Sequence, residues 1–253
     1  KSGHQIWADT CLEVTQSFDL QTKRHDIIGV VDNDPVTWDQ ALDLVHDVLS
    51  SKIKSFLNYY DGTVKVFLSG GVDTLLVYSY LRRFTTRIEM VWNNHIDYDR
   101  FWMLNSGTIK EHWAYRQIHH WIQPSVLASG APGDEFMLRS PYTAHMWTQW
   151  HGLDLARLLQ GNYQDCYHNY YFARQNHMKL FASQVEPVTD CKQRVRQLCN
   201  NVVNDFQHWH LGHTLTWTPL RDLEIFKIML RVPPEQVLQQ IMNSDFSRSL
   251  IER

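Results

Sequence analysis

A short apolar segment that runs directly into a glycine turn and then a helix constrains the fold of this 253-residue chain more than any other feature. Val64–Leu68 is a β-branched and aromatic run, which is typical of a buried strand. The turn Ser69–Thr74 follows, and apolar residues at helical spacing predict a helix over Thr74–Arg83. Strand, glycine turn and helix form one βα unit. Such units predict a parallel sheet with ligands at the carboxyl ends of its strands.

The same alternation continues along the chain. Ile88–Trp92 is predicted to be a second strand, Ile109–Ile122 a second helix and Ser125–Ala128 a third strand. That third strand again ends in a loop with glycines, residues 129–135, and the pattern beyond Tyr142 is mostly helical. We therefore expect an α/β fold, with a twisted parallel sheet flanked by helices and a helical C-terminal half.

Two regions are expected along the chain. Residues 1–34 carry no strong period and are predicted to form an N-terminal arm with short strands at Gln5–Ala8 and Ile27–Val31. Residues 35–253 are predicted to form one α/β domain, because no internal repeat or low-complexity linker divides them.

The domain is predicted to begin with an amphipathic helix over Pro35–Leu57, in which apolar residues recur every three or four positions. Two start signals are present, and the sequence leaves both open. Pro35 would suit the first turn, and Thr37 with Gln40 would form a capping box.

Composition excludes several classes of protein. The net charge of −3 gives no field that favours nucleic acid, and no apolar run approaches the roughly 18 residues of a membrane span. The four cysteines are scattered and include no closely spaced pair, which argues against a zinc ribbon or a disulfide-stabilised secreted fold. We therefore expect a soluble cytoplasmic protein that does not bind membranes, and nothing in the composition indicates a nucleic-acid partner.

The turn after the first strand has the chemistry of a phosphate site. Gly70 and Gly71 let backbone N–H groups approach an anion, and the helix that follows adds the positive end of its dipole. The hydroxyls of Ser69 and Thr74 can donate to phosphate oxygens. Asp73 beside phosphates implies an intervening Mg²⁺. The alternative interpretation is a tight turn that caps a helix and binds no ligand.

The motif Ser-Gly-Gly-Val-Asp-Thr over residues 69–74 resembles the pyrophosphate loop of the N-type ATP pyrophosphatases. Residues 126–136 resemble the second loop of the asparagine synthetase synthetase-domain family, to which β-lactam synthetase is related. Thr218–Asp222 and Leu230–Glu235 resemble two later landmarks of that family, in the family's order. The resemblance implies a fold like that of the adenine nucleotide alpha hydrolases.

The resemblance also implies roles for individual residues. Asp73 and Asp134 would share Mg²⁺ on the pyrophosphate, although two acids at 134–135 also suit an ordinary helix start. Arg248 would neutralise pyrophosphate where relatives carry a lysine. The remaining candidates would hold the cofactor ATP; they are Leu68, Ser69, Gly70, Gly71, Asp73, Thr74, Val91, Trp92, Ser129 and Gly130.

Three departures from the family pattern concern the acceptor half of the site. Ala131 stands where relatives have Glu or Tyr, Leu215–Trp217 replaces a Glu-x-Arg motif, and no clear match to the C-terminal lysine is present. The residues before the first loop are too few for the glutaminase domain of asparagine synthetases. We therefore expect ammonia from a separate glutaminase or another source, or a free amine as the nucleophile.

The sequence thus predicts an ATP-dependent C–N ligase that forms AMP and pyrophosphate. It would adenylate a carboxylate or similar group on a small-molecule or peptide acceptor, and ammonia or an amine would capture the product. Two alternatives stay open. The same loop could activate a nucleobase or carbonyl oxygen, or a catalytically degenerate member could bind nucleotide and act as a partner or regulatory protein.

Overall fold

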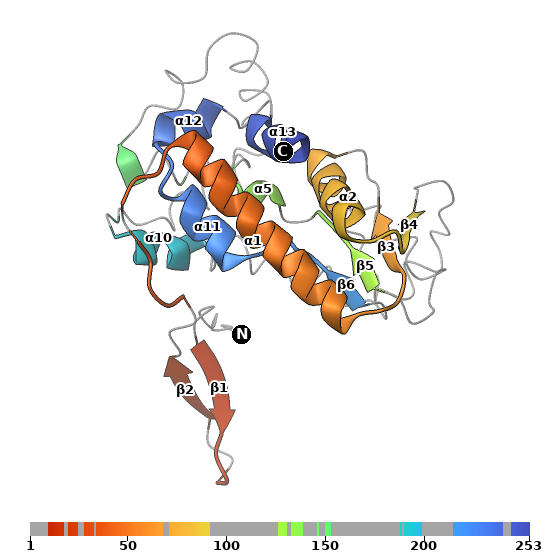
Figure 1. Ribbon diagram of the computed structural model, residues 1–253. Coiled ribbons are helices and arrows are strands. Elements are labelled where there is room, and N and C mark those ends of the chain that lie inside the picture. The colour runs from red at the N-terminus through yellow and green to blue at the C-terminus, as the bar shows by residue number, and fades with distance from the viewer. Residues whose placement is uncertain are drawn as a thin grey trace, which may run out of the picture.

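The computed structural model places a small parallel sheet among helices, with a separate strand pair near the N-terminus (Figure 1). It describes residues 10–17, 20–24, 28–32, 34–67, 71–91, 126–130, 133–138, 146, 150–152, 188, 190–198, 215–239 and 244–253.

Helix α1 spans Trp38–Tyr59 and is the longest helix described. Its N-cap is Thr37, whose hydroxyl accepts from the Gln40 N–H at 3.2 Å while the Gln40 side chain accepts from the Thr37 N–H at 2.8 Å. The capping box, rather than Pro35, therefore starts the helix. The face that carries Ala41, Leu42, Val45, Leu49 and Ile53 is buried, as the spacing predicts.

The sheet has four parallel strands in the order β4-β3-β5-β6. Strand β3 (Val64–Phe67) pairs with β4 (Ile88–Val91) on one side and with β5 (Val126–Ala128) on the other. The α/β character and the parallel sheet are thus as predicted. Val66 is opposite Met90 and Ala128, so the three strands end at the same edge.

The fourth strand, β6 (Leu215–Trp217), was not predicted. It pairs in parallel with β5, with Trp217 opposite Ala128. The mostly helical pattern predicted beyond Tyr142 did not indicate this strand. The strand β5 is equally short, but a glycine loop marks its end, whereas no glycine turn follows Trp217. The stability of β6 comes from its pairing with β5.

Two helices of the C-terminal half, α11 (Leu223–Met229) and α13 (Asp245–Glu252), pack against α1, and α13 also packs against α2 (Val72–Phe84). Figure 1 shows α11 and α13 beside α1, and α2 beside the sheet. The phenol of Tyr80, fully buried on α2, lies 2.8 Å from His46 Nδ1 on α1, and burial raises the pKa of Tyr80 to about 12. The described part of the chain also contains the helices α5 (Gly133–Phe136), α10 (Cys191–Leu198) and α12 (Pro234–Gln239).

Near the N-terminus, β1 (Thr10–Val14) and β2 (Leu20–Arg24) form an antiparallel pair, which Figure 1 shows apart from the main sheet. The strand expected at Ile27–Val31 is wrong for residues 28–31, which have no strand structure, and the one expected at Gln5–Ala8 lies outside the described residues. Ile28 is nevertheless buried in the core, so its apolar character serves packing instead of a sheet.

One core joins α1, α2, the sheet and the C-terminal helices. Among the described residues, none of the helices combines the length and the apolar character needed to cross a membrane. The helix predicted over Ile109–Ile122 lies outside the described part of the chain.

Candidate functional site

The centre of the sheet contains a topological switch point. The connection from β3 leads to β4 on one side, whereas the next strand, β5, lies on the other side of β3. Chains that leave neighbouring parallel strands in opposite directions open a crevice at the carboxyl edge, where ligands of α/β proteins bind. Both glycine loops of the sequence follow strands at this point, one after β3 and one after β5.

The two loops are in direct contact at Gly130. A Cβ atom at Gly130 would lie 2.5 Å from the carbonyl carbon of Asp73 and 2.5 Å from the backbone nitrogen of Thr74. Real Cβ atoms do not approach backbone this closely, so only glycine fits. The end of β5 is therefore packed on the first turn of α2.

A second close approach involves the Asp73 side chain. A Cβ at Gly133 would lie 2.8 Å from Asp73 Cγ and 2.7 Å from Leu220 Cδ1. The Gly133 N–H donates to the Gly130 carbonyl at 2.8 Å, which closes the turn from β5 into α5. The carboxylate of Asp73 thus lies at the start of α5, and its Oδ1 atom is buried.

Two residues with hydroxyl groups are buried where the two loops meet. Thr74 and Ser129 are each 7% exposed. The Ser129 N–H donates to the Trp217 carbonyl at 2.9 Å, which fixes the loop after β5 to the end of β6. Gly71 is the N-cap of α2, so this helix begins at the crevice with its positive dipole end.

The structure brings four of the sequence-predicted residues together: Asp73, Thr74, Ser129 and Gly130. Gly71 immediately precedes them as the cap of α2, and Val91 ends β4 opposite Phe67. Leu68, Ser69, Gly70 and Trp92 lie outside the described residues.

The two remaining predicted residues are placed less directly. Asp134 follows Gly133 in α5, so its backbone is one residue from the Asp73 contact, and its side chain lies outside the description. Arg248 is on the exposed face of α13, a helix that packs against α2 and α1. Its role in neutralising pyrophosphate stays a prediction.

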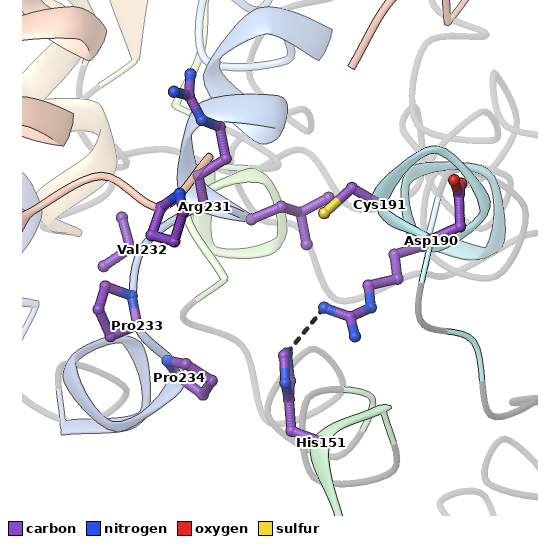
Figure 2. Close-up of a pocket in the computed structure, with 10 residues that line it drawn as sticks. His151, Asp190, Cys191, Arg231, Val232, Pro233 and Pro234 are labelled. Carbon is purple, nitrogen blue, oxygen red and sulfur yellow. Dashed lines mark hydrogen bonds between the residues drawn. The ribbon is translucent and has the colours of Figure 1, made fainter. Parts of the chain in front are cut away.

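A separate pocket of about 630 Å³ lies between α10 and the α11–α12 connection (Figure 2). Its polar lining comes chiefly from His151, Asp190, Arg194 and Arg231. This pocket was not predicted, because the residues that line it form no spaced motif in the sequence. The only local signal was the Leu230–Glu235 landmark, which supplies one wall.

Two groups of this pocket have shifted pKa values. Burial, and then the charge of Arg194, lowers the pKa of His151 to about 4, against a smaller opposing effect of Glu235. Burial also raises the pKa of the Cys191 thiol. Both groups are therefore neutral near pH 7.

Within the part of the chain that the structure describes, no group of three or more His, Cys, Asp or Glu side chains could hold a metal ion. A magnesium ion bound mainly by substrate phosphates needs only one or two protein carboxylates, so Asp73 at the crevice suits that kind of site. Comparisons with protein-family models, with curated proteins and with solved structures found no match to this chain.

Proposed function

We propose that this protein binds Mg-ATP in the crevice between β3 and β5 and uses it as an AMP-forming C–N ligase. One observation carries the proposal: the contact of Gly130 with the backbone of Asp73 and Thr74. One loop has the chemistry of a phosphate site and the other resembles the second loop of the asparagine synthetase synthetase-domain family, and the two meet at the switch point of a parallel sheet. A turn that merely capped α2 would not need a second glycine loop against it.

We further propose that the fold is of the adenine nucleotide alpha hydrolase type. The parallel order β4-β3-β5-β6, with the phosphate loop after β3, supports this assignment. In this arrangement the loop between β3 and α2 would cradle the phosphates, and the ends of β4 and β5 would flank the nucleoside. Val91 and Ser129 lie at those two strand ends.

The residues at the start of α2 would hold the triphosphate. The first N–H groups of the helix after Gly71 would donate to phosphate oxygens, and the Thr74 hydroxyl would add another donor. Asp73, and Asp134 at the neighbouring turn of α5, would hold Mg²⁺. When bound, Mg²⁺ would offset the charge that builds on the leaving pyrophosphate.

In the proposed reaction, a carboxylate oxygen of the acceptor forms a bond to the α-phosphorus of ATP. The bond from that phosphorus to the bridging oxygen breaks, and pyrophosphate leaves with the electron pair. Ammonia or an amine then attacks the acyl carbon, loses a proton and displaces AMP. Backbone donors at the loops would orient the phosphates, and the packed strand ends would limit access of water.

The first test is calorimetric titration with a non-hydrolysable α,β-analogue of ATP, with and without Mg²⁺. We expect the wild type to bind the analogue in a magnesium-dependent way. Asp73→Ala and Asp73→Asn should each lower the affinity for the analogue by about tenfold or more in the presence of Mg²⁺. Asp39→Ala is the matched control, because Asp39 is also an acid in the first turn of a helix but is exposed on α1.

Absence of binding in the wild type would reject the nucleotide site. Binding without release of AMP and pyrophosphate, across a panel of carboxylic acids with ammonia or amines, would instead favour a nucleotide-binding regulatory protein. The observation behind that second candidate is Ala131, which supplies no acid or base where relatives have one.

A further inference from the structure

The pocket between α10 and the α11–α12 connection contains a buried arginine with an unusual set of partners. Arg194 is only 7% exposed. Its Nε donates to the Val188 carbonyl at 3.0 Å, and its Nη1 lies 3.0 Å from His151 Nε2. The guanidinium carbon also lies 5.8 Å from the centre of the Trp150 ring. Among the described residues, no carboxylate forms an ion pair with this guanidinium.

His151 cannot balance that charge. Because arginine has only donors, the Nε2 atom of His151 must accept the hydrogen bond, so the ring is neutral and its proton is on Nδ1. Figure 2 shows this hydrogen bond as the dashed line between His151 and the arginine of α10. The imidazole therefore orients the guanidinium without neutralising it.

The other charged residues of the pocket are already engaged. Arg231 places Nη2 2.9 Å from Asp32 Oδ2 and donates from Nε to the Asp34 carbonyl at 2.7 Å. Asp190 is exposed, and its Oδ1 accepts from the Gln193 N–H at 2.9 Å. Its charge opposes the effect of burial on Arg194, but burial is the larger effect and lowers the pKa of Arg194. Within the described part of the chain, the Arg194 guanidinium has two neutral hydrogen-bond acceptors, and these engage two of its five N–H donors. A buried cation with so few partners is costly, so a further anionic partner would stabilise it.

The rest of the lining is apolar. Leu230, Val232, Pro233 and Pro234 form the wall contributed by the α11–α12 connection. In Figure 2, Val232 and the two prolines lie across the pocket from Asp190 and Cys191. The volume of about 630 Å³ falls in the range of small-molecule sites.

We propose that this pocket binds a small organic carboxylate, whose anionic end pairs with Arg194 and whose apolar body lies against Leu230, Val232 and the prolines. A single buried guanidinium matches one carboxylate, in the paired-donor geometry that arginine favours. A phosphate dianion would call for further cations, and the second arginine is held by Asp32. The site is distinct from the proposed nucleotide crevice.

The test measures binding without nucleotide, so that its result does not depend on the ATP proposal. The probes are 4-methylpentanoate, the neutral isostere 4-methylpentanamide, and inorganic phosphate, followed by calorimetry or ligand-observed NMR. We expect the carboxylate to bind at one site with a dissociation constant of about 10 mM or below. The amide should bind with an affinity lower by about tenfold or more.

Arg194→Gln should weaken carboxylate binding by about tenfold or more, and Arg194→Lys should weaken it less. Lys192→Gln is the matched control, since it removes a positive charge from the same helix and does not line the pocket. If Arg194→Gln does not fold, the comparison of carboxylate with amide on the wild type still decides the matter.

Three results would overturn the proposal. They are equal binding of the acid and the amide, no binding of the acid at about 10 mM, and binding of phosphate in place of the acid. Unchanged carboxylate affinity in a folded Arg194→Gln variant would equally rule out the assigned contact.

Discussion

Gly130 lies directly against the backbone of Asp73: a Cβ at position 130 would be 2.5 Å from the Asp73 carbonyl carbon and 2.8 Å from its oxygen. These residues are far apart in the sequence and follow different strands. Their contact closes the carboxyl edge of the sheet between β3 and β5 and fixes the start of α2. It is the structural basis of the proposed nucleotide site.

The first prediction concerns this contact. Gly130→Ala should lower the free energy of unfolding by about 2 kcal/mol or more, because the new methyl group meets backbone that cannot move aside. Chemical denaturation measures the effect. Gly152→Asn is the control, since Gly152 has open space around it and a φ of 60° that asparagine tolerates. Equal stability of Gly130→Ala and wild type would contradict the close contact.

The second prediction concerns the attachment of residues 28–36 to the body of the domain. Arg231 contacts Asp32 and Asp34, and its carbonyl accepts from the Val36 N–H at 3.1 Å. Arg231→Met should increase the rate of hydrogen exchange in this segment, because a half-buried charge-assisted contact is lost. The same change should lower the free energy of unfolding by about 1–2 kcal/mol. Arg82→Met, at an exposed position on α2, should change neither quantity.

The third prediction is a pH dependence that originates at His151. Its pKa is lowered to about 4 in the folded protein, from 6.5 for the free side chain. The unfolded chain therefore binds a proton at His151 more readily than the folded protein does. The contribution of neutral His151 to the stability of the fold is complete above pH 6.5 and is lost as the pH falls toward 4. His151→Gln should flatten the stability profile within this window. A variant whose profile keeps the wild-type slope would show that other groups cause the loss.

The fourth prediction concerns the contact between α1 and β6. The rings of Phe56 and Trp217 are stacked, with centroids 3.8 Å apart and an interplanar angle of 14°. A double-mutant cycle with Phe56→Ala and Trp217→Ala should give a coupling energy of about 0.5–1.5 kcal/mol. Tyr59, which is 90% exposed on the same helix, should show no coupling with Trp217. Additive losses for Phe56 and Trp217 would mean that the stacking does not stabilise the fold.

Local sequence signals predicted the elements that have strong signals of their own. Thr37 with Gln40 was one of two predicted start signals for α1, because a capping box depends only on residues three positions apart, and the structure shows that it is the one used. The strand expected at Val64–Leu68 and the helix at Thr74–Arg83 were found as β3 and α2, with boundaries that differ by one or two residues. The strand at Ser125–Ala128 was found as β5.

Signals failed where stability comes from distant partners. The strand pair β1–β2 was missed, because the sequence between Thr10 and Arg24 has no clear turn signal. The apolar pattern around Ile28 predicts a strand, but in the structure Ile28 packs in the hydrophobic core without pairing in a sheet. The pocket around Arg194 assembles residues from three separate segments, and no spacing in the chain could indicate it.

The sequence by itself determined the βα unit around Ser69–Thr74 and the long helix before it, since the apolar periodicity, the capping box and the glycine turn are patterns within each segment. Only the tertiary structure decided the strand order, the pairing of β6, and the contact of Gly130 with Asp73. The physical reason is that these features arise from packing and hydrogen bonding between segments far apart in the chain. The energy of such contacts is not encoded in any local pattern.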